Sequence, residues 1–321
     1  MPIDYCLILA AGFGTRMGII GHQLPKVLWP VFEKTLLELQ VAYARSLGIK
    51  KIYINLHFMG KEIEDFCLSK SVFEDVVFLW EKPEILDIGG AIHNLASLSE
   101  VSYRGKLLVL NADQFFYIPK DQLIKYQTEN SQASSLLFTY WVDSSLGYNA
   151  IEVDQQRIFK KIIKNKDILQ HKKIETYTGI SLIDLNQLKP VSGPSAFFNS
   201  VCLYQQQDIP TILLDKIDYW DFGTLKRYWE SCFRILQTYA INSNHPFLRF
   251  LVNERALKTW KINLQKASYN ATAAGVINLG ADKMSDDIPP SIFLDESNKR
   301  DKKRAGAAVY WKDLSEEITL S

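Results

Sequence analysis

The chain has 321 residues, a formal net charge of +1, 47% hydrophobic residues and 23% charged residues. This composition is typical of a globular protein, and the balanced charge gives no electrostatic case for binding nucleic acid or a membrane surface. At this length the chain has room for more than one domain.

The cysteines are far apart in the sequence and form no Cys-x-x-Cys pair. Such isolated residues are typical of small buried side chains in a reducing compartment, and not of a disulfide framework or a zinc site. No apolar run approaches the ~18 residues that a membrane span requires, and the N-terminal run lacks the basic flank of a signal peptide. We therefore expect a cytoplasmic protein.

Predicted strands and helices alternate up to about residue 140. The strands are predicted at residues 5–10, 51–57, 76–80 and 107–110, and the helices at 35–47, after Gly60 and at 89–98. This alternation predicts a Rossmann-like α/β fold, with a mainly parallel sheet covered by helices on both faces. Ligands of such sheets bind outside the carboxyl ends of the strands, where we expect Gly12, Glu81 and Asp113 to converge.

The rhythm changes in the second half of the chain. Strands predicted at 135–142, 148–153 and 177–183 are joined by charged loops, and we expect them to extend the parallel sheet into a mixed one. A helix over 225–239 closes a first domain of residues 1–240. Residues 241–321 are predicted to form a small C-terminal appendage. There "GVINLG" and "PPSIFLD" hint at short β-helix-like strands, while dimerisation and simple packing are alternatives.

The stretch "LILAAGFGTRMG", residues 7–18, suits the binding of phosphate groups. Its glycines let the backbone approach a ligand closely, and the exposed N–H groups of such a loop form a concave anion site. Arg16 adds a planar cation, and Lys26 supplies a second one after Pro25. The loop has neither the Gly-Lys-Ser/Thr of a P-loop nor the third glycine of the dinucleotide fingerprint. The alternative is a glycine-rich turn with two solvated cations.

Two aspartates are candidate ligands for a metal ion. Asp113 follows a predicted strand after Asn111-Ala112, and Asp221 precedes a Gly-Thr pair and a predicted helix. Mg²⁺ takes one or two carboxylates and completes its shell with water and phosphate oxygen. The alternatives are that Asp113 caps a turn and that Asp221 is favoured by a helix dipole.

Five motifs together resemble the sugar-1-phosphate nucleotidyltransferases, and most of all the mannose-1-phosphate guanylyltransferases, heptose-phosphate guanylyltransferases and N-acetylmuramate-phosphate uridylyltransferases. The motifs are LAAGFGTRM (9–17), PK (25–26), NAD (111–113), YTGI (177–180) and DFGT (221–224). The resemblance covers about residues 3–235 and implies a nucleotide-diphospho-sugar transferase type of fold, with the catalytic domain at 1–240. It also implies a Mg²⁺-dependent reaction in which a sugar 1-phosphate attacks the α-phosphorus of a nucleoside triphosphate and pyrophosphate leaves. A homo-oligomer is left open.

The resemblance also implies a role for each matching residue. Arg16 would hold the outgoing β- and γ-phosphates and Lys26 would contact the α-phosphate. Asp113 and Asp221 would hold Mg²⁺. The implied nucleotide-binding residues are Leu9, Ala10, Ala11, Gly12, Gly14, Thr15, Glu81, Gly89, Gly90 and Asn111. The implied sugar-binding residues are Asn149, Lys164, Lys166, Thr178 and Gly179.

The choice of base follows from Glu81 alone. An ionised carboxylate accepts hydrogen bonds and donates none, which suits the N–H groups of guanine or the amino group of cytosine better than an acceptor-rich base edge, and guanine is narrowly favoured. A solvated Glu81 is the alternative.

The chain departs from the family pattern chiefly on the acceptor side. Lys164-Asn165-Lys166 replaces a Glu-Lys-Pro motif, and Asn149 stands where many relatives have glycine. Nearer the nucleotide, Ala112 replaces a glycine and Ile88 a threonine. These changes predict an unusual acceptor or lost activity. The alternatives are a cytidylyltransferase acting on a phosphorylated alcohol such as phosphocholine, and a non-catalytic nucleotide-sugar sensor.

Overall fold

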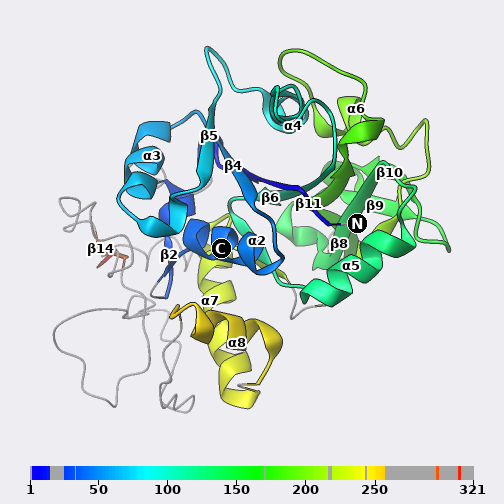
Figure 1. Cartoon of the computed structure of the whole chain (residues 1–321). Coiled ribbons are helices and arrows are strands. Elements are labelled where there is room, and N and C mark those ends of the chain that lie inside the picture. Colours follow the sequence, from blue (N-terminus) through cyan, green and yellow to red (C-terminus); the bar gives the residue numbers. More distant parts are fainter. Residues whose placement is uncertain are drawn as a thin grey trace, which may run out of the picture.

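The computed structural model describes residues 2–14, 25–32, 34–169, 171–215, 219–242 and 244–256, with short strands at 294–295 and 310–311. A seven-stranded sheet in the order β12-β8-β11-β6-β1-β4-β5 runs through the molecule (Figure 1). The strands are β1 (Tyr5–Leu9), β4 (Lys51–Leu56), β5 (Val76–Trp80), β6 (Lys106–Asn111), β8 (Ser135–Asp143), β11 (Lys173–Asp184) and β12 (Thr211–Leu213). Only β11 runs antiparallel to its neighbours, so the predicted mixed, mainly parallel sheet is confirmed.

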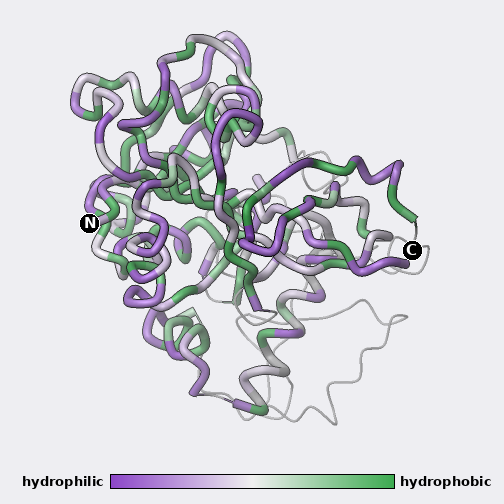
Figure 2. Tube along the Cα trace, turned by 90° about the vertical axis from the view of Figure 1, so that its right-hand side faces the viewer, coloured by the Kyte–Doolittle hydropathy of each residue, from purple (hydrophilic) through white to green (hydrophobic). Residues whose placement is uncertain are grey.

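The central strand β1 is buried on both faces. Cys6 and Ile8 contribute to one hydrophobic core, and Leu7 to the other. Such a strand shows the continuous apolar run of a covered parallel sheet, which is why its sequence predicts it well. In Figure 2 the hydrophobic stretches lie mainly in the interior and the hydrophilic ones mainly in the outer loops.

Helices cover both faces of the sheet, as predicted (Figure 1). The helices α2 (Leu36–Ser46), α3 (Gly60–Leu68), α5 (Lys120–Glu129), α7 (Leu225–Ile241) and α8 (Pro246–Asn253) contribute to the first core. The helices α4 (Asp87–Ala96) and α6 (Phe197–Ser200) contribute to the second. None of the described helices is long and apolar enough to span a membrane.

Helix α2 has a capping box that fixes its start. Thr35 Oγ1 accepts from the Glu38 amide, and the Glu38 carboxylate accepts from the Thr35 amide at 2.8 Å. Such a cap stabilises a helix by about 1 kcal/mol. The chain leaves the helix at Gly48, whose φ of +90° suits glycine.

The predicted strand at 148–153 does not join the main sheet. It is shortened to β9 (Ala150–Val153) and pairs with β10 (Phe159–Ile163) in a separate two-stranded sheet. It does not pair with β8, the strand that precedes it, because β8 already has β11 on one edge and β12 on the other.

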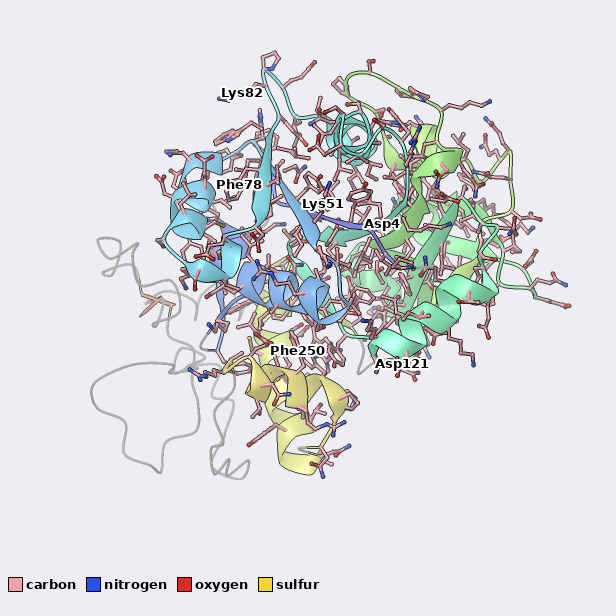
Figure 3. All side chains as sticks on the ribbon, in the orientation of Figure 1. Asp4, Lys51, Phe78, Lys82, Asp121 and Phe250 are labelled. Carbon is pink, nitrogen blue, oxygen red and sulfur yellow. The ribbon has the colours of Figure 1, made fainter. Side chains whose placement is uncertain are left out.

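Part of the predicted appendage packs against the first domain. From α8, Phe247 stacks on Trp220 at a centroid distance of 3.7 Å, and Phe250 stacks on Phe115 at 6.0 Å. Figure 3 labels Phe250 on this helix. Further on, β14 (Leu294–Asp295) and β15 (Tyr310–Trp311) pair antiparallel. The stretch "GVINLG" lies outside the described residues, and the boundary at residue 240 stays a prediction.

Candidate nucleotide and metal site

The candidate site lies at the carboxyl ends of β1, β4 and β6. Asp4 and Lys51, labelled in Figure 3, mark the opposite amino ends of β1 and β4. Leu9, the last residue of β1, stands opposite Asn55 on one side and Asn111 on the other. The glycine loop therefore leaves the sheet between two asparagine side chains.

Backbone hydrogen bonding holds the start of this loop. The Ala10 amide donates to Asn55 Oδ1 at 2.7 Å, and the Ala112 amide donates to the Leu9 carbonyl at 3.2 Å. Among the described residues, no heavy atom lies within 4 Å of a Cβ built at Gly12, so none of them covers the backbone there. The loop thus has the accessible backbone that a phosphate cradle needs. Thr15 and Arg16 lie outside the described residues.

Glu81 connects this loop to helix α4. Its Oε1 accepts from Asn55 Nδ2 at 2.7 Å, and its Oε2 accepts from the Leu86 amide at 2.8 Å. The residue is only 1% exposed, so the alternative of a solvated glutamate is wrong. A buried carboxylate requires such hydrogen-bond donors. Through Asn55 and Leu86, the Glu81 carboxylate links the residue after β1 to the start of α4.

Lys26 and Asp113 form an ion pair in the site. Lys26 Nζ lies 2.5 Å from Asp113 Oδ2, and the two side chains are 16% and 9% exposed. Lys26 begins the 3₁₀ helix η2 (Lys26–Leu28), whose Val27 and Leu28 are buried. Burial of these neighbours anchors the lysine at the end of β6, although it is far from Asp113 in sequence.

The structure brings the segment that ends at Asp221 beside the segment that follows Asp113. Strand β13 (Tyr219–Asp221) pairs antiparallel with β7 (Gln114–Phe116), and this register sets Asp221 opposite Gln114. The Phe222 amide donates to the Asp113 carbonyl at 2.9 Å. Asp221 Oδ1 accepts from the Gly223 amide at 2.7 Å, while Oδ2 lies 3.3 Å from Arg227 Nη1.

The donor set fits a hard divalent cation. In the described part of the chain no three His, Cys, Asp or Glu side chains form a metal cluster, so a zinc-like cage is not built there. One carboxylate in the turn before β7 and one at the end of β13 are instead the partial oxygen set that Mg²⁺ takes, with water and phosphate oxygen completing its shell. Asp113 and Asp221 would hold such an ion.

The structure also brings Gly179 against Asn111. Gly179 has a φ of +82°, and a Cβ there would lie 1.9 Å from Asn111 Nδ2. It sits where the register of β11 shifts between Tyr177 and Ser181. The neighbouring Thr178 is 2% exposed and donates its hydroxyl to the Phe138 carbonyl at 2.8 Å, so this hydroxyl serves the sheet.

Two residues that depart from the family pattern on the sugar-phosphate side, Asn149 and Asn165, link the loop after β8 to the loop after β10. Asn149 Oδ1 accepts from the Asn165 amide at 3.0 Å, and Asn165 Nδ2 donates to the Ser144 carbonyl at 3.0 Å. Lys164 and Lys166 flank this tie and are exposed. The asparagines at positions 149 and 165 thus hold the two loops together by hydrogen bonds.

Gly89 and Gly90 allow close packing of α4. A Cβ at Gly89 would lie 2.4 Å from Ser200 Oγ, and one at Gly90 would lie 2.6 Å from the Gly193 carbonyl. Both glycines are therefore required by the contact between α4 and the segment 193–200, whatever they do toward a nucleotide.

Gln40 and Asn55 also organise the site, and neither was predicted from the sequence. Gln40 is 1% exposed on α2, and its Nε2 donates to the Asn111 and Gln114 carbonyls at 2.7 and 2.6 Å. Asn55 holds the Ala10 amide. The available signals were a glutamine on an apolar helix face and an asparagine near the end of a buried strand.

The cysteines are free and buried, as predicted. Burial raises the pKa of the Cys67 and Cys202 thiols to about 12 and that of Cys6 and Cys232 further. None of them is a thiolate at neutral pH, so they do not act as nucleophiles.

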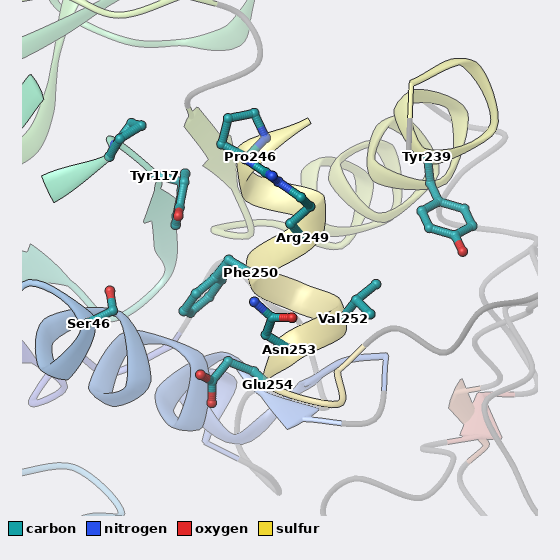
Figure 4. Close-up of a pocket in the computed structure, with 10 residues that line it drawn as sticks. Ser46, Tyr117, Tyr239, Pro246, Arg249, Phe250, Val252, Asn253 and Glu254 are labelled. Atoms are coloured by element: carbon teal, nitrogen blue, oxygen red, sulfur yellow. The ribbon is translucent and has the colours of Figure 1, made fainter. Parts of the chain in front are cut away.

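One cavity adjoins the candidate site, and a larger one lies away from the predicted site residues. A cavity of about 150 Å³ is lined by Asp221, Arg227 and Tyr148 among others. A larger one of about 660 Å³, shown in Figure 4, lies between the end of α2, Tyr117 and α8. The larger cavity contains none of the predicted site residues.

Comparison with known proteins agrees with this fold. A family model described as Nucleotidyl transferase matches residues 5–238. Two solved structures are similar in fold. HddC from Yersinia pseudotuberculosis is 20% identical with a TM-score of 0.58, covering 72% of this chain and 99% of its own. A UDP-glucose pyrophosphorylase is 17% identical with a TM-score of 0.57, covering 74% and 99%. The mixed sheet with its site at the strand ends is therefore of the nucleotide-diphospho-sugar transferase type.

The chain belongs to the nucleotidyl transferase family. It is 30% identical to a protein named bifunctional protein GlmU from Synechococcus sp. strain RCC307, over 56% of this chain and 38% of that protein. It is 27% identical to a bifunctional sugar-1-phosphate nucleotidylyltransferase/acetyltransferase from Sulfurisphaera tokodaii, over 50% of this chain and 36% of that protein. The chain thus spans less than half the length of these two relatives.

Proposed function

We propose that this protein transfers a nucleoside monophosphate from a nucleoside triphosphate to a sugar 1-phosphate, giving a nucleoside diphosphate sugar and pyrophosphate. The observation that supports this proposal is the pairing of β7 with β13, which brings the segments that carry Asp113 and Asp221 together at the carboxyl end of β6. The resemblance to sugar-1-phosphate nucleotidyltransferases supports the same reaction.

In this proposal the chain mainly positions the reactants and supplies charge. The open backbone around Gly12 and the cation Arg16 receive the β- and γ-phosphates. Lys26, at the end of β6, faces the α-phosphate. Mg²⁺, held by Asp113 and Asp221, would supply charge neutralisation at the phosphate oxygens.

For the nucleotide we propose GTP as the favoured donor. The support is the similar HddC, which has been solved with GMP-PN. Both Glu81 oxygens are hydrogen-bonded to Asn55 and Leu86. Glu81 therefore serves the pocket by holding the Ala10 turn and the start of α4 in place. We also propose the cytoplasm as its compartment, which suits four buried free thiols.

The test is a pyrophosphate-release assay with each of the four NTPs against a panel of sugar 1-phosphates, at saturating Mg²⁺. We expect release with at least one pair, and GTP ahead of UTP in competition. Phosphocholine with CTP is included, so release with that pair alone would identify a cytidylyltransferase instead. Nucleotide binding by folded protein without any release would contradict the transfer reaction and indicate a sensor.

A further inference from the structure

Arg227 is a cation buried beside the candidate metal ligand. Its side chain is 14% exposed, and Nη1 lies 3.3 Å from Asp221 Oδ2. Nη2 donates to the Leu146 carbonyl at 2.5 Å, and the guanidinium lies 4.2 Å from the ring centroid of Tyr148. It sits in the first turn of α7, whose N-cap Thr224 accepts from the Arg227 amide.

The position of Arg227 places it on the acceptor side. Tyr148 directly precedes Asn149, and its carbonyl accepts from Asn165 Nδ2 at 3.3 Å. The guanidinium also lines the cavity of about 150 Å³ that opens from Asp221. Lys164 and Lys166 lie on neighbouring surface but are exposed, so Arg227 is the better desolvated cation for an anionic group.

A second arginine in the same cavity has a different role. Arg234 donates to the Tyr140 hydroxyl at 3.2 Å and to the Tyr219 carbonyl, and it lies over the Trp220 ring. These partners belong to the packed ribbon and sheet, so Arg234 is a structural residue. Arg227 is held instead by a carboxylate that a metal ion would share, a loop carbonyl and an aromatic face.

We propose that Arg227 exchanges partners: it neutralises Asp221 when no divalent ion is bound, and it binds the acceptor's phosphate when the ion takes that carboxylate. This proposal rests on the proposed function. A divalent ion on Asp221 repels a guanidinium at this distance, and Tyr148 keeps the released cation nearby through its ring face. The planar guanidinium of arginine can donate two hydrogen bonds to a phosphate group at once, whereas the ammonium of an exposed lysine is a point charge.

Partner exchange gives a signature that a structural arginine would not give. Arg227→Met removes the Arg227 charge from beside Asp221, so metal binding to the free protein should become tighter. The same substitution removes the phosphate ligand, so acceptor binding should become weaker. A structural role would instead weaken both or change neither.

The experiment titrates Mn²⁺ into the full chain by electron paramagnetic resonance, with no nucleotide present. We expect Arg227→Met to lower the Mn²⁺ Kd by about tenfold and Arg227→Lys, which keeps the charge, to leave it near the wild-type value. With the acceptor found by the pyrophosphate assay, Arg227→Met should raise the acceptor KM at least about tenfold while the NTP KM stays within about twofold. Arg104→Met is the matched control, because Arg104 is exposed and precedes the amino end of β6, away from the site.

Two results separate this proposal from the proposed function. Unchanged or weaker Mn²⁺ binding by Arg227→Met overturns the exchange, whether or not turnover is found. Tighter Mn²⁺ binding in a protein that releases no pyrophosphate with any acceptor overturns the transfer reaction and the phosphate half of the exchange. If Arg227→Met fails to fold, Arg227→Gln replaces it with the same expected directions.

Discussion

The amide of Phe222 donates a 2.9 Å hydrogen bond to the backbone carbonyl of Asp113. This bond closes the short ribbon of β7 and β13 at the end that faces the glycine loop. Backbone pairing therefore brings the two segments that carry the candidate metal ligands together, although they are far apart in sequence.

The first prediction concerns these two carboxylates. Asp113→Asn and Asp221→Asn should each lower the rate of pyrophosphate release by at least about 100-fold at saturating Mg²⁺, because an amide binds a divalent cation far less well than a carboxylate. The measurement is kcat in the coupled pyrophosphate assay with the best substrate pair.

The matched control for this prediction is Asp208→Asn. The Asp208 side chain is 84% exposed and lies 4.0 Å from Lys160, so its loss should leave kcat unchanged. A near wild-type rate for either Asp113→Asn or Asp221→Asn would show that the metal ligands have been assigned wrongly.

The second prediction concerns the contact of Gly179 with Asn111. Gly179→Ala should destabilise the fold by about 3 kcal/mol or more in urea unfolding, because the new methyl meets the Asn111 amide and the backbone is strained at positive φ. Gly147→Ala is the control, since Gly147 has a φ of +78° and a methyl group added there would meet no heavy atom of the described residues within 4 Å. It should cost only about 1 kcal/mol. Equal losses in the two variants would refute the close approach.

The third prediction concerns the hydrogen bonds of Glu81. Glu81→Gln places an NH₂ group against a donor, either the Asn55 amide or the Leu86 N–H, so one buried bond is lost. We expect about 1–3 kcal/mol of lost stability and weaker binding of a fluorescent GTP analogue. Glu84→Gln, on an exposed neighbouring residue, should alter neither quantity. Full nucleotide affinity in Glu81→Gln would mean that the Asn55–Glu81 link does not hold the binding loop.

The fourth prediction concerns pH and His93. Burial lowers the pKa of His93, and the opposing hydrogen bond with the Ser200 carbonyl does not restore it. An unfolded histidine titrates near ~6.5, so below that pH the unfolded chain binds more protons and stability from the buried neutral ring is lost. The stability advantage of wild type over His93→Gln should therefore shrink between about pH 7.5 and about 5.5. Urea unfolding at the two pH values measures it, and a constant or growing advantage would contradict the assignment.

The fold was predictable where burial alone decides local structure. The buried strands β1 and β6 are apolar runs, or nearly so, that end at polar or glycine residues, and their positions follow from the sequence within a residue or two. Strand β5 is also an apolar run, although most of its side chains are only partly buried. Asp113 could be placed at the sheet edge because it directly follows such a strand.

The remaining features depend on contacts between distant segments. The β9–β10 ribbon lies outside the main sheet, where β11 and β12 occupy both edges of β8, and no local pattern reveals that arrangement. The same holds for Gln40, which reaches the Asn111 carbonyl from a helix, and for Arg227, whose partners lie on another loop. Gly89 and Gly90 were predicted as nucleotide-binding residues, and the structure shows a second reason for them. Helix α4 packs so closely on the segment 193–200 that no side chain fits at either position.

The measurement that tests the central claim most directly is a crystal structure with Mn²⁺ and a non-hydrolysable GTP analogue, with anomalous data collected at the manganese edge. We predict one Mn²⁺ between the carboxylates of residues 113 and 221, in contact with the α-phosphate beside the glycine loop. Manganese bound elsewhere, or held without Asp221, would contradict the account.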